Sequence, residues 1–326
     1  MKKIFPIFVI VFSLLIGTHE LLYSWGFFAH KRINRLAVFT LPKDMVKFYK
    51  IHIEYITENA VAPDRRRHAM PNEPPRHYID IDHYGVNPLD SMPRKWKDAV
   101  AKYSEDTLLA YGIVPWHIVK TTKWLTEAFR KKDIDKILYH SVDLGHYIGD
   151  SHVPLHCTEN YNGQMTNQKG IHGFWESRLP ELFSDNYDFF VGKAIYIDFP
   201  LDYAWTIVEA SFNAKDSVLE MEAELNERYS PDLKYTYENR GQSLLKVYSE
   251  EYSKEYHKIL DGMVERRMRA SIHAIGSFWY TAWVNAGKPD LESLMDKQMS
   301  KALKKQLKEE ERMWRTGKIY GRDHQD

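Results

Sequence analysis

The chain has 326 residues, and its 45 basic and 45 acidic side chains give a formal net charge of zero at pH 7. This balance excludes a global positive field that attracts nucleic acid, so any polyanion must be bound locally. The single cysteine, Cys157, excludes an intrachain disulfide, and we interpret it as a small buried hydrophobic residue. The core or bound metal must therefore stabilise the fold.

The first residues are typical of a secretory signal. Met1, Lys2 and Lys3 form a basic start, and an apolar stretch, 4–17, follows. That stretch is too short and too early to be a good membrane span, although an uncleaved anchor is the alternative. We expect residues 1–24 to be a signal peptide, cleaved after Ser24 to leave Trp25 as the mature terminus. The expected location is periplasmic or secreted.

Apolar residues recur at helical spacing along most of the remaining chain. The helices predicted from this spacing cover residues 33–41, 45–56, 96–103, 108–129, 134–148, 203–225 and 244–284. Only 189–199 is rich enough in aromatic and branched residues to suggest a short strand. The prediction is an all-α, single-domain helical bundle over residues 25–299. A charged tail, 300–326, follows, and we expect its helix to be solvated.

Two pairs of potential metal ligands lie between residues 145 and 178. His146 and Asp150 are four residues apart, as are His172 and Glu176. If both stretches are helical, the two members of each pair project from the same helix face. Two such helices together can hold a divalent metal.

A fifth potential ligand, His156, follows the first pair. Pro154 cannot continue a helix, so the helix of His146 should end near Ser151 or His152. His156 is therefore expected in the exit loop. A second loop, 159–170, separates it from the helix of His172 and is rich in Asn, Gln and Gly, as loops that border sites often are.

Three earlier segments contain residues suited to the same site. They are residues 25–30 with His30, residues 63–67 with Asp64, and residues 76–80 with His77. Each is weak alone, because a lone His or Asp is more often a capping or surface residue than a ligand. Together with the later run they supply five imidazoles and three carboxylates.

In this order, the segments resemble the superfamily that contains the single-strand-specific three-zinc nucleases and the bacterial zinc-dependent phospholipases C. The resemblance extends from Trp25 through the segment 112–116 to the motifs 146–150 and 172–176, and so covers most of the mature chain. It implies an all-α bundle with a trinuclear zinc cluster in a cleft, and three Zn²⁺ ions per chain.

The resemblance also implies a ligand set. The first zinc would be held by Asp64, His77, His146 and Asp150, the second by His156, His172 and Glu176, and the third by His30, Asp150 and the amine and carbonyl of Trp25. Asp150 would thus bridge two metals, which suits a carboxylate with two oxygens. Asp64, Asp150 and Arg67 are the implied catalytic residues, with Arg67 as the cation that helps neutralise the phosphate.

The implied activity is zinc-dependent hydrolysis of phosphate esters. Tyr78 and Asp80 would then bind substrate, together with Arg67. In a single-strand-specific nuclease of the endonuclease and 3′-nucleotidase type, Tyr78 would stack on a base and Asp80 would hydrogen-bond to its edge. This is the first expectation, with single-stranded nucleic acid or nucleotide as substrate and the protein a monomer without a stable protein partner.

Two alternatives remain open. A zinc-dependent phospholipase C is the first, because an aromatic ring beside a carboxylate also suits the trimethylammonium of choline. Glu176 favours this branch, since the nucleases usually have Asp at that position. A non-catalytic zinc-binding protein is the second, and a missing ligand would favour it.

Overall fold

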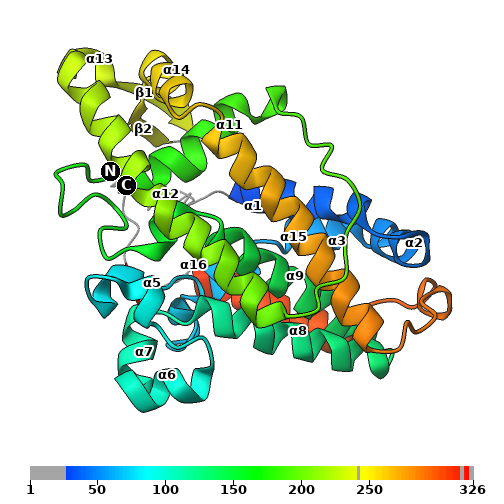
Figure 1. Ribbon diagram of the computed structural model, residues 1–326. Helices are drawn as coiled ribbons and strands as arrows, with labels where there is room; N and C mark the ends of the chain where they lie inside the picture. The colour runs from blue at the N-terminus through cyan, green and yellow to red at the C-terminus, as the bar shows by residue number, and fades with distance from the viewer. Residues whose placement is uncertain (1–26, 241–242, 316–318, 323–326) are drawn as a thin grey trace, which may run out of the picture.

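The computed structural model describes residues 27–240, 243–315 and 319–322, and the regular secondary structure of these residues is almost entirely helical (Figure 1). The predicted all-α fold is confirmed. The predicted signal peptide and Trp25 lie outside the described residues. Among the helices that are described, none is both long enough and apolar enough to cross a membrane.

The long helices are α1 (Phe27–Ala37), α8 (Val114–Arg130), α9 (Ile134–Ser151), α12 (Pro200–Arg228), α14 (Glu250–Ile259), α15 (Met263–Asn285) and α16 (Lys301–Arg315). The shorter ones are α2 (Lys43–Ile51), α3 (Ile53–Glu58), α4 (Ala62–Arg66), α5 (Pro88–Ser91), α6 (Trp96–Tyr103), α7 (Glu105–Tyr111), α10 (Ile171–Gly173), α11 (Leu179–Phe183) and α13 (Pro231–Lys234). Short 3₁₀ segments include η2 (Pro74–Arg76) and η4 (Pro154–Cys157), and a π-helical turn, η5, spans Phe174–Arg178.

Helix α9 lies at the centre of the bundle. It packs against α8, α12, α15 and α1, which surround it in the ribbon view (Figure 1). Every residue from 141 to 151 is buried, so this stretch must match its neighbours closely in shape. Gly145 illustrates the tightness, because a Cβ there would lie 1.9 Å from the side-chain oxygen of Asn34 on α1. A site built on α9 is therefore held by a rigid element.

The helix predicted over 108–129 is two helices, α7 and α8. Gly112 separates them with a φ of 96°, a conformation that favours glycine. A Cβ at Gly112 would lie 2.1 Å from the backbone oxygen of Tyr78. Glycine is needed here both for the turn and for the close approach to the Tyr78 segment.

The predicted strand 189–199 is wrong. The segment is extended, but its amides donate hydrogen bonds to other elements: Ile195 to the Ser277 hydroxyl at 3.1 Å and Ile197 to the Thr281 hydroxyl at 2.9 Å. These α15 hydroxyls satisfy the backbone, so no neighbouring strand is needed. The described strands are instead β1 (Tyr235–Arg240) and β2 (Ser243–Tyr248), which pair antiparallel. Strand β2 also overlaps the start of the helix predicted over 244–284, the rest of which forms α14 and α15.

The expected solvated tail helix, α16, is solvated on one face only. Leu303, Glu310 and Trp314 are buried, while Lys304 and Lys308 are exposed. The Trp314 ring lies 5.9 Å from that of Phe27, between ring centroids, and α16 packs along α4. The run of charged residues gave no indication of the few α16 side chains that face the core.

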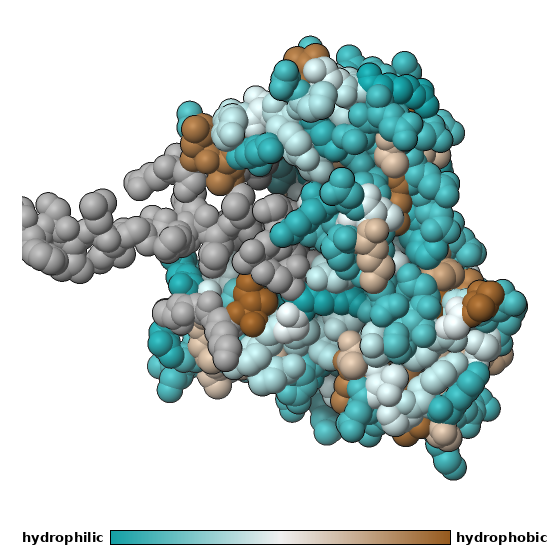
Figure 2. All heavy atoms as spheres, turned by 90° about the vertical axis from the view of Figure 1, so that its left-hand side faces the viewer, coloured by the Kyte–Doolittle hydropathy of each residue, from teal (hydrophilic) through white to brown (hydrophobic). Residues whose placement is uncertain are grey.

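The surface in Figure 2 is mainly hydrophilic, with apolar side chains in small separate groups.

A buried charge cluster joins α16 to the core. The Arg66 guanidinium lies 2.8 Å from an Asp143 oxygen, 3.5 Å from Glu73 and 3.8 Å from Glu310, measured from nitrogen to carboxylate oxygen. Burial raises the pKa of Asp143 to about 6 even with Arg66 beside it. Arg66 therefore ties α4, α9 and α16 together through Asp143 and Glu310, whereas Glu73 also pairs with Arg76.

We expect Arg66→Met to destabilise the protein by about 3–5 kcal/mol at pH 8, because it removes the cation beside the buried Asp143 carboxylate. The pKa of Asp143 would then rise further above its value in the unfolded chain, so the loss should be smaller at pH 5, where protonation removes the buried negative charge. Urea unfolding at both pH values measures this, with Arg315→Met, which removes an exposed ion pair to Glu311, as the control. An equal loss at both pH values would contradict the account.

Candidate metal centre

Eight of the nine predicted metal ligands converge in the structure, and we call them the metal centre. The members are His30 on α1, Asp64 on α4, His77 after η2, His146 and Asp150 on α9, His156 on η4, His172 on α10 and Glu176 on the π-helical turn. All are buried except Asp64, which is partly exposed. The ninth, Trp25, lies outside the described residues.

Asp150 is the residue that joins the first group of ligands. One carboxylate oxygen lies 3.1 Å from His30 Nε2, and the other lies 2.9 Å from His77 Nδ1 and 3.2 Å from His146 Nε2. Asp64 completes this group, with an oxygen 3.5 Å from His146 Nε2. The two Asp150 oxygens therefore face different imidazoles, as a bridging carboxylate requires.

The second group is separate and compact. Glu176 places one oxygen 3.1 Å from His172 Nε2 and the other 3.4 Å from His156 Nε2. The helix of His146 ends at Ser151, as predicted, and Pro154 begins the short 3₁₀ segment that carries His156. The helix predicted for the other pair is irregular, because it changes from α to π geometry at Phe174. Such π turns are frequent at functional sites.

Backbone carbonyls fix the orientation of three imidazoles. His146 Nδ1 lies 2.8 Å from the Ala60 oxygen, His156 Nδ1 2.7 Å from that of His77, and His172 Nδ1 2.9 Å from that of Tyr161. In the neutral imidazole, a proton on Nδ1 that donates this bond leaves Nε2 as an acceptor that points into its group. Metal-binding histidines are usually held this way by a second contact.

His77 differs from His146, His156 and His172, because its Nδ1 faces Asp150 and not a backbone carbonyl. Its Nε2 lies 3.7 Å from an oxygen of Glu73, a fully buried carboxylate. Burial by itself raises the pKa of Glu73, but Arg66 and His77 outweigh burial and hold it well below the ordinary value. Glu73 is therefore an ionised positioning residue that the sequence reading missed. Its position in a proline-rich loop gave no periodic signal.

The carboxylates of the metal centre are ionised. Burial by itself raises the pKa of Glu176, but His172 and His156 outweigh it and lower the value to about 2. Burial likewise raises the pKa of Asp150, and His146 and His156 outweigh it and hold the value well below the ordinary range. Buried anions flanked by imidazoles can take up a divalent cation.

The predicted substrate residues lie together beside the metal centre. Tyr78 follows the ligand His77 and is 7 % exposed, Asp80 is 2 % exposed, and Arg67 is 8 % exposed. Two residues that the sequence reading did not select also lie there: the guanidinium carbon of Arg322 is 3.6 Å from the Tyr78 ring centroid and 4.6 Å from that of Tyr161. Nothing in the sequence relates position 322 to position 78.

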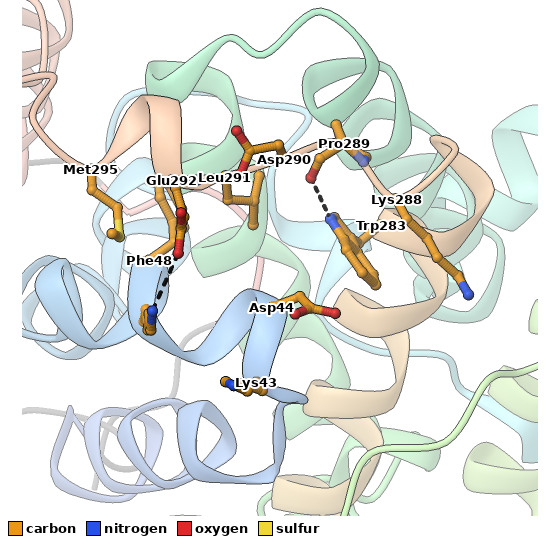
Figure 3. Close-up of a pocket in the computed structure, with 11 residues that line it drawn as sticks. Lys43, Asp44, Phe48, Trp283, Lys288, Pro289, Asp290, Leu291, Glu292 and Met295 are labelled. Carbon is orange, nitrogen blue, oxygen red and sulfur yellow. Dashed lines mark hydrogen bonds and ion pairs between the residues drawn. The ribbon is translucent and has the colours of Figure 1, made fainter.

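A cavity of about 460 Å³ lies apart from these residues, between α2 and the segment after α15 (Figure 3). Its lining mixes charged and apolar side chains, and some of them contact each other: Lys47 lies 3.2 Å from Glu292, and the Trp283 ring nitrogen donates to the Pro289 oxygen at 2.9 Å. None of its lining residues belongs to the metal centre. This cavity therefore does not extend the site.

No protein-family model matches the chain, and no curated protein matches it. The resemblance therefore rests on the ligand pattern alone.

Proposed function

We propose that the protein is a zinc-dependent hydrolase of phosphate esters, with single-stranded nucleic acid or nucleotides as its first substrate class. The observation that carries the proposal is the convergence of eight potential ligands, all but Asp64 buried, in two groups, the first of which is joined through Asp150. Histidine with carboxylate ligands suits zinc. In a tetrahedral arrangement with bonds of about 2.0–2.1 Å, ligand atoms lie roughly 3.3 Å apart. The contacts of 2.9–3.5 Å within the groups are close to this spacing.

The number of ions is part of the proposal. Asp64, His77, His146 and Asp150 would hold one zinc, and His156, His172 and Glu176 a second. His30 and Asp150 would hold a third if Trp25 is the mature terminus and adds its amine and carbonyl. Three Zn²⁺ ions against three carboxylates leave a formal positive surplus, which favours a phosphate ester as guest.

Zinc, when bound, would lower the pKa of water to about 7 and stabilise charge on a phosphate. The chain's own residues would do the rest. Asp150 and Asp64 fix the ligand geometry, Arg67 can donate two parallel hydrogen bonds to phosphate oxygens, and the Tyr78 ring offers a face for stacking. The hydrolysis itself needs no covalent intermediate on the protein.

The substrate class is tested by assaying the zinc-loaded protein on single-stranded DNA, RNA, mononucleotide 3′-phosphates and phosphatidylcholine, with and without chelator. We expect chelator-sensitive cleavage of the nucleic acids and 3′-nucleotides. Cleavage of the lipid alone would instead indicate a phospholipase C. Full zinc occupancy without cleavage of any substrate would indicate the second alternative, a non-catalytic zinc-binding protein.

One observation favours the phospholipase alternative. The Tyr78 and Tyr161 rings already hold a cation, Arg322, next to the Asp80 carboxylate. A choline head group is also a cation that aromatic faces bind. Trimethylammonium lacks N–H donors, however, so Asp80 would gain a charge contact with it and no hydrogen bond.

Removing the Tyr78 ring should lower the rate of hydrolysis whether the substrate is a nucleic acid or a phospholipid. We expect Tyr78→Ala to lower kcat/KM on single-stranded DNA by about 5- to 150-fold, because stacking on an aromatic contributes about 1–3 kcal/mol per base. Tyr78→Phe, which keeps the ring, is the matched control and should stay close to wild type. Equal losses in both variants would show that the ring face does not bind the base.

Zinc uptake should depend on pH. Burial by itself lowers the pKa of His156, but Asp150 and Glu176 outweigh it and raise the value to about 9 in the metal-free protein. The proton must leave before the imidazole can bind metal, so protons compete below pH 9 and affinity rises with pH. We expect about a tenfold gain per pH unit between pH 6 and 8 for this one proton. Calorimetric titration with Zn²⁺ measures it, and a pH-independent affinity would contradict it.

A further inference from the structure

The guanidinium of Arg322 is seated in the proposed substrate pocket, which we define as Tyr78, Tyr161 and Asp80. It lies over both rings, at 3.6 Å from Tyr78 and 4.6 Å from Tyr161, measured to the ring centroids. Its edge forms an ion pair with the Asp80 carboxylate. The Arg322 side chain is only 12 % exposed and that of Asp80 only 3 %. The chain thus supplies its own ligand to this pocket.

The backbone around Arg322 is fitted to the same place. The Tyr320 amide donates to the Arg67 oxygen at 3.0 Å, and Arg67 Nη2 donates to the Arg322 oxygen at 2.5 Å. Gly321 has a φ of 81°, and a Cβ there would lie 2.4 Å from that of Pro74, so glycine is required. The tail segment, residues 319–322, therefore engages Arg67 as well as the pocket.

Helix α16 holds the tail segment close to the pocket. It ends at Arg315, seven positions before Arg322, and its buried Trp314 and Glu310 fix it against α4, the helix that precedes Arg67. A short tether of this kind gives an effective concentration in the millimolar range. Burial lowers the pKa of Arg322 to about 10, which still leaves it charged at neutral pH. A tethered cation can therefore compete with a free ligand.

We propose that the tail segment is an intramolecular competitor of substrate, which must leave the pocket and Arg67 before a phosphate ester can use them. The proposal rests on the function proposed above, because it places substrate on Tyr78, Asp80 and Arg67. The planar Arg322 guanidinium lies between two ring faces and offers N–H donors to Asp80. A planar nucleic-acid base with an amino group would use the same ring faces and the same carboxylate. Substrate and tail would be mutually exclusive.

The first experiment measures tail docking without turnover. Amide hydrogen exchange at Tyr320 is followed in the zinc-loaded full chain and in Arg322→Ala, with Arg315→Ala as the control at an exposed position on the same tail. We expect slow exchange in wild type and the control, and fast exchange in Arg322→Ala. Equal exchange in wild type and Arg322→Ala would overturn the proposal, whether or not the protein is a hydrolase.

The second experiment measures competition. If the tail fills the pocket nine-tenths of the time, apparent affinity is reduced about tenfold, so Arg322→Ala should lower KM about tenfold with little change in kcat. A chain truncated after residue 318 should show the same decrease in KM. This second variant excludes an effect that comes only from the alanine substitution. An active Arg322→Ala protein with an unchanged KM would overturn the proposal. Absence of any hydrolysis would instead count against the proposed function, and Tyr320 exchange alone would then decide tail docking.

Discussion

Asp150→Asn is expected to abolish activity together with binding of the two metals that Asp150 would bridge. The two Asp150 oxygens face three imidazoles, those of His30, His77 and His146. An amide lacks the negative charge and one of the two oxygens, so it cannot bridge two metals. Losing several kcal/mol of charge stabilisation lowers kcat/KM by about a thousandfold or more. Kinetic assays and elemental analysis of the same preparation measure both effects.

The control for this substitution is Asp135→Asn. Asp135 lies on the same helix, α9, in its first turn and away from the metal centre, where it is partly exposed and accepts a hydrogen bond from the Ser300 amide that an asparagine oxygen can also accept. It should keep wild-type activity and metal content. The central role of Asp150 would be refuted by an Asp150→Asn protein that retains both.

Removal of metal is expected to lower the melting temperature strongly. The metal-free centre confines three carboxylates among buried imidazoles, and bound cations would neutralise them. Each site that is filled at 100 to 1,000 times its Kd stabilises the native state by roughly 2.7–4.1 kcal/mol. At about 2 °C per kcal/mol for a chain of this size, three sites correspond to a drop on the order of 15–25 °C.

Scanning calorimetry with excess Zn²⁺ and with chelator measures this difference. The Asp150→Asn protein is the matched control, because chelator should shift its melting temperature much less than that of wild type. An unchanged melting temperature in chelator, for wild type already shown to contain zinc, would contradict a stabilising role of the metal centre.

The sequence predicted the elements whose signal is local. Helix α9 and its end at Ser151 followed from apolar spacing and from Pro154, and α6 matched at both ends. The strand prediction for 189–199 failed because side chains of α15 accept hydrogen bonds from a segment that looks like a strand by composition. The tail helix α16 was misjudged because its three buried residues, Leu303, Glu310 and Trp314, are widely spaced among charges.

The metal centre was predictable because its ligands are chemically distinctive and two pairs are at helical spacing. The convergence of His30, Asp64 and His77 on α9 could be expected only from the family resemblance, since these residues are 69 to 120 positions from their Asp150 or His146 partners. The Arg322 contact was not predictable, because it joins two distant segments with no shared pattern. Glu73 was missed for a different reason, because it lies in a proline-rich loop that has no periodic signal.

The account depends above all on which atoms hold metal, and anomalous X-ray diffraction at the zinc absorption edge tests this most directly. For crystals of the mature protein purified with zinc, we predict three anomalous peaks. One lies among Asp64, His77, His146 and Asp150, one among His156, His172 and Glu176, and one beside His30 and Asp150. Density without an anomalous peak at these residues, or peaks only elsewhere on the molecule, would contradict the account.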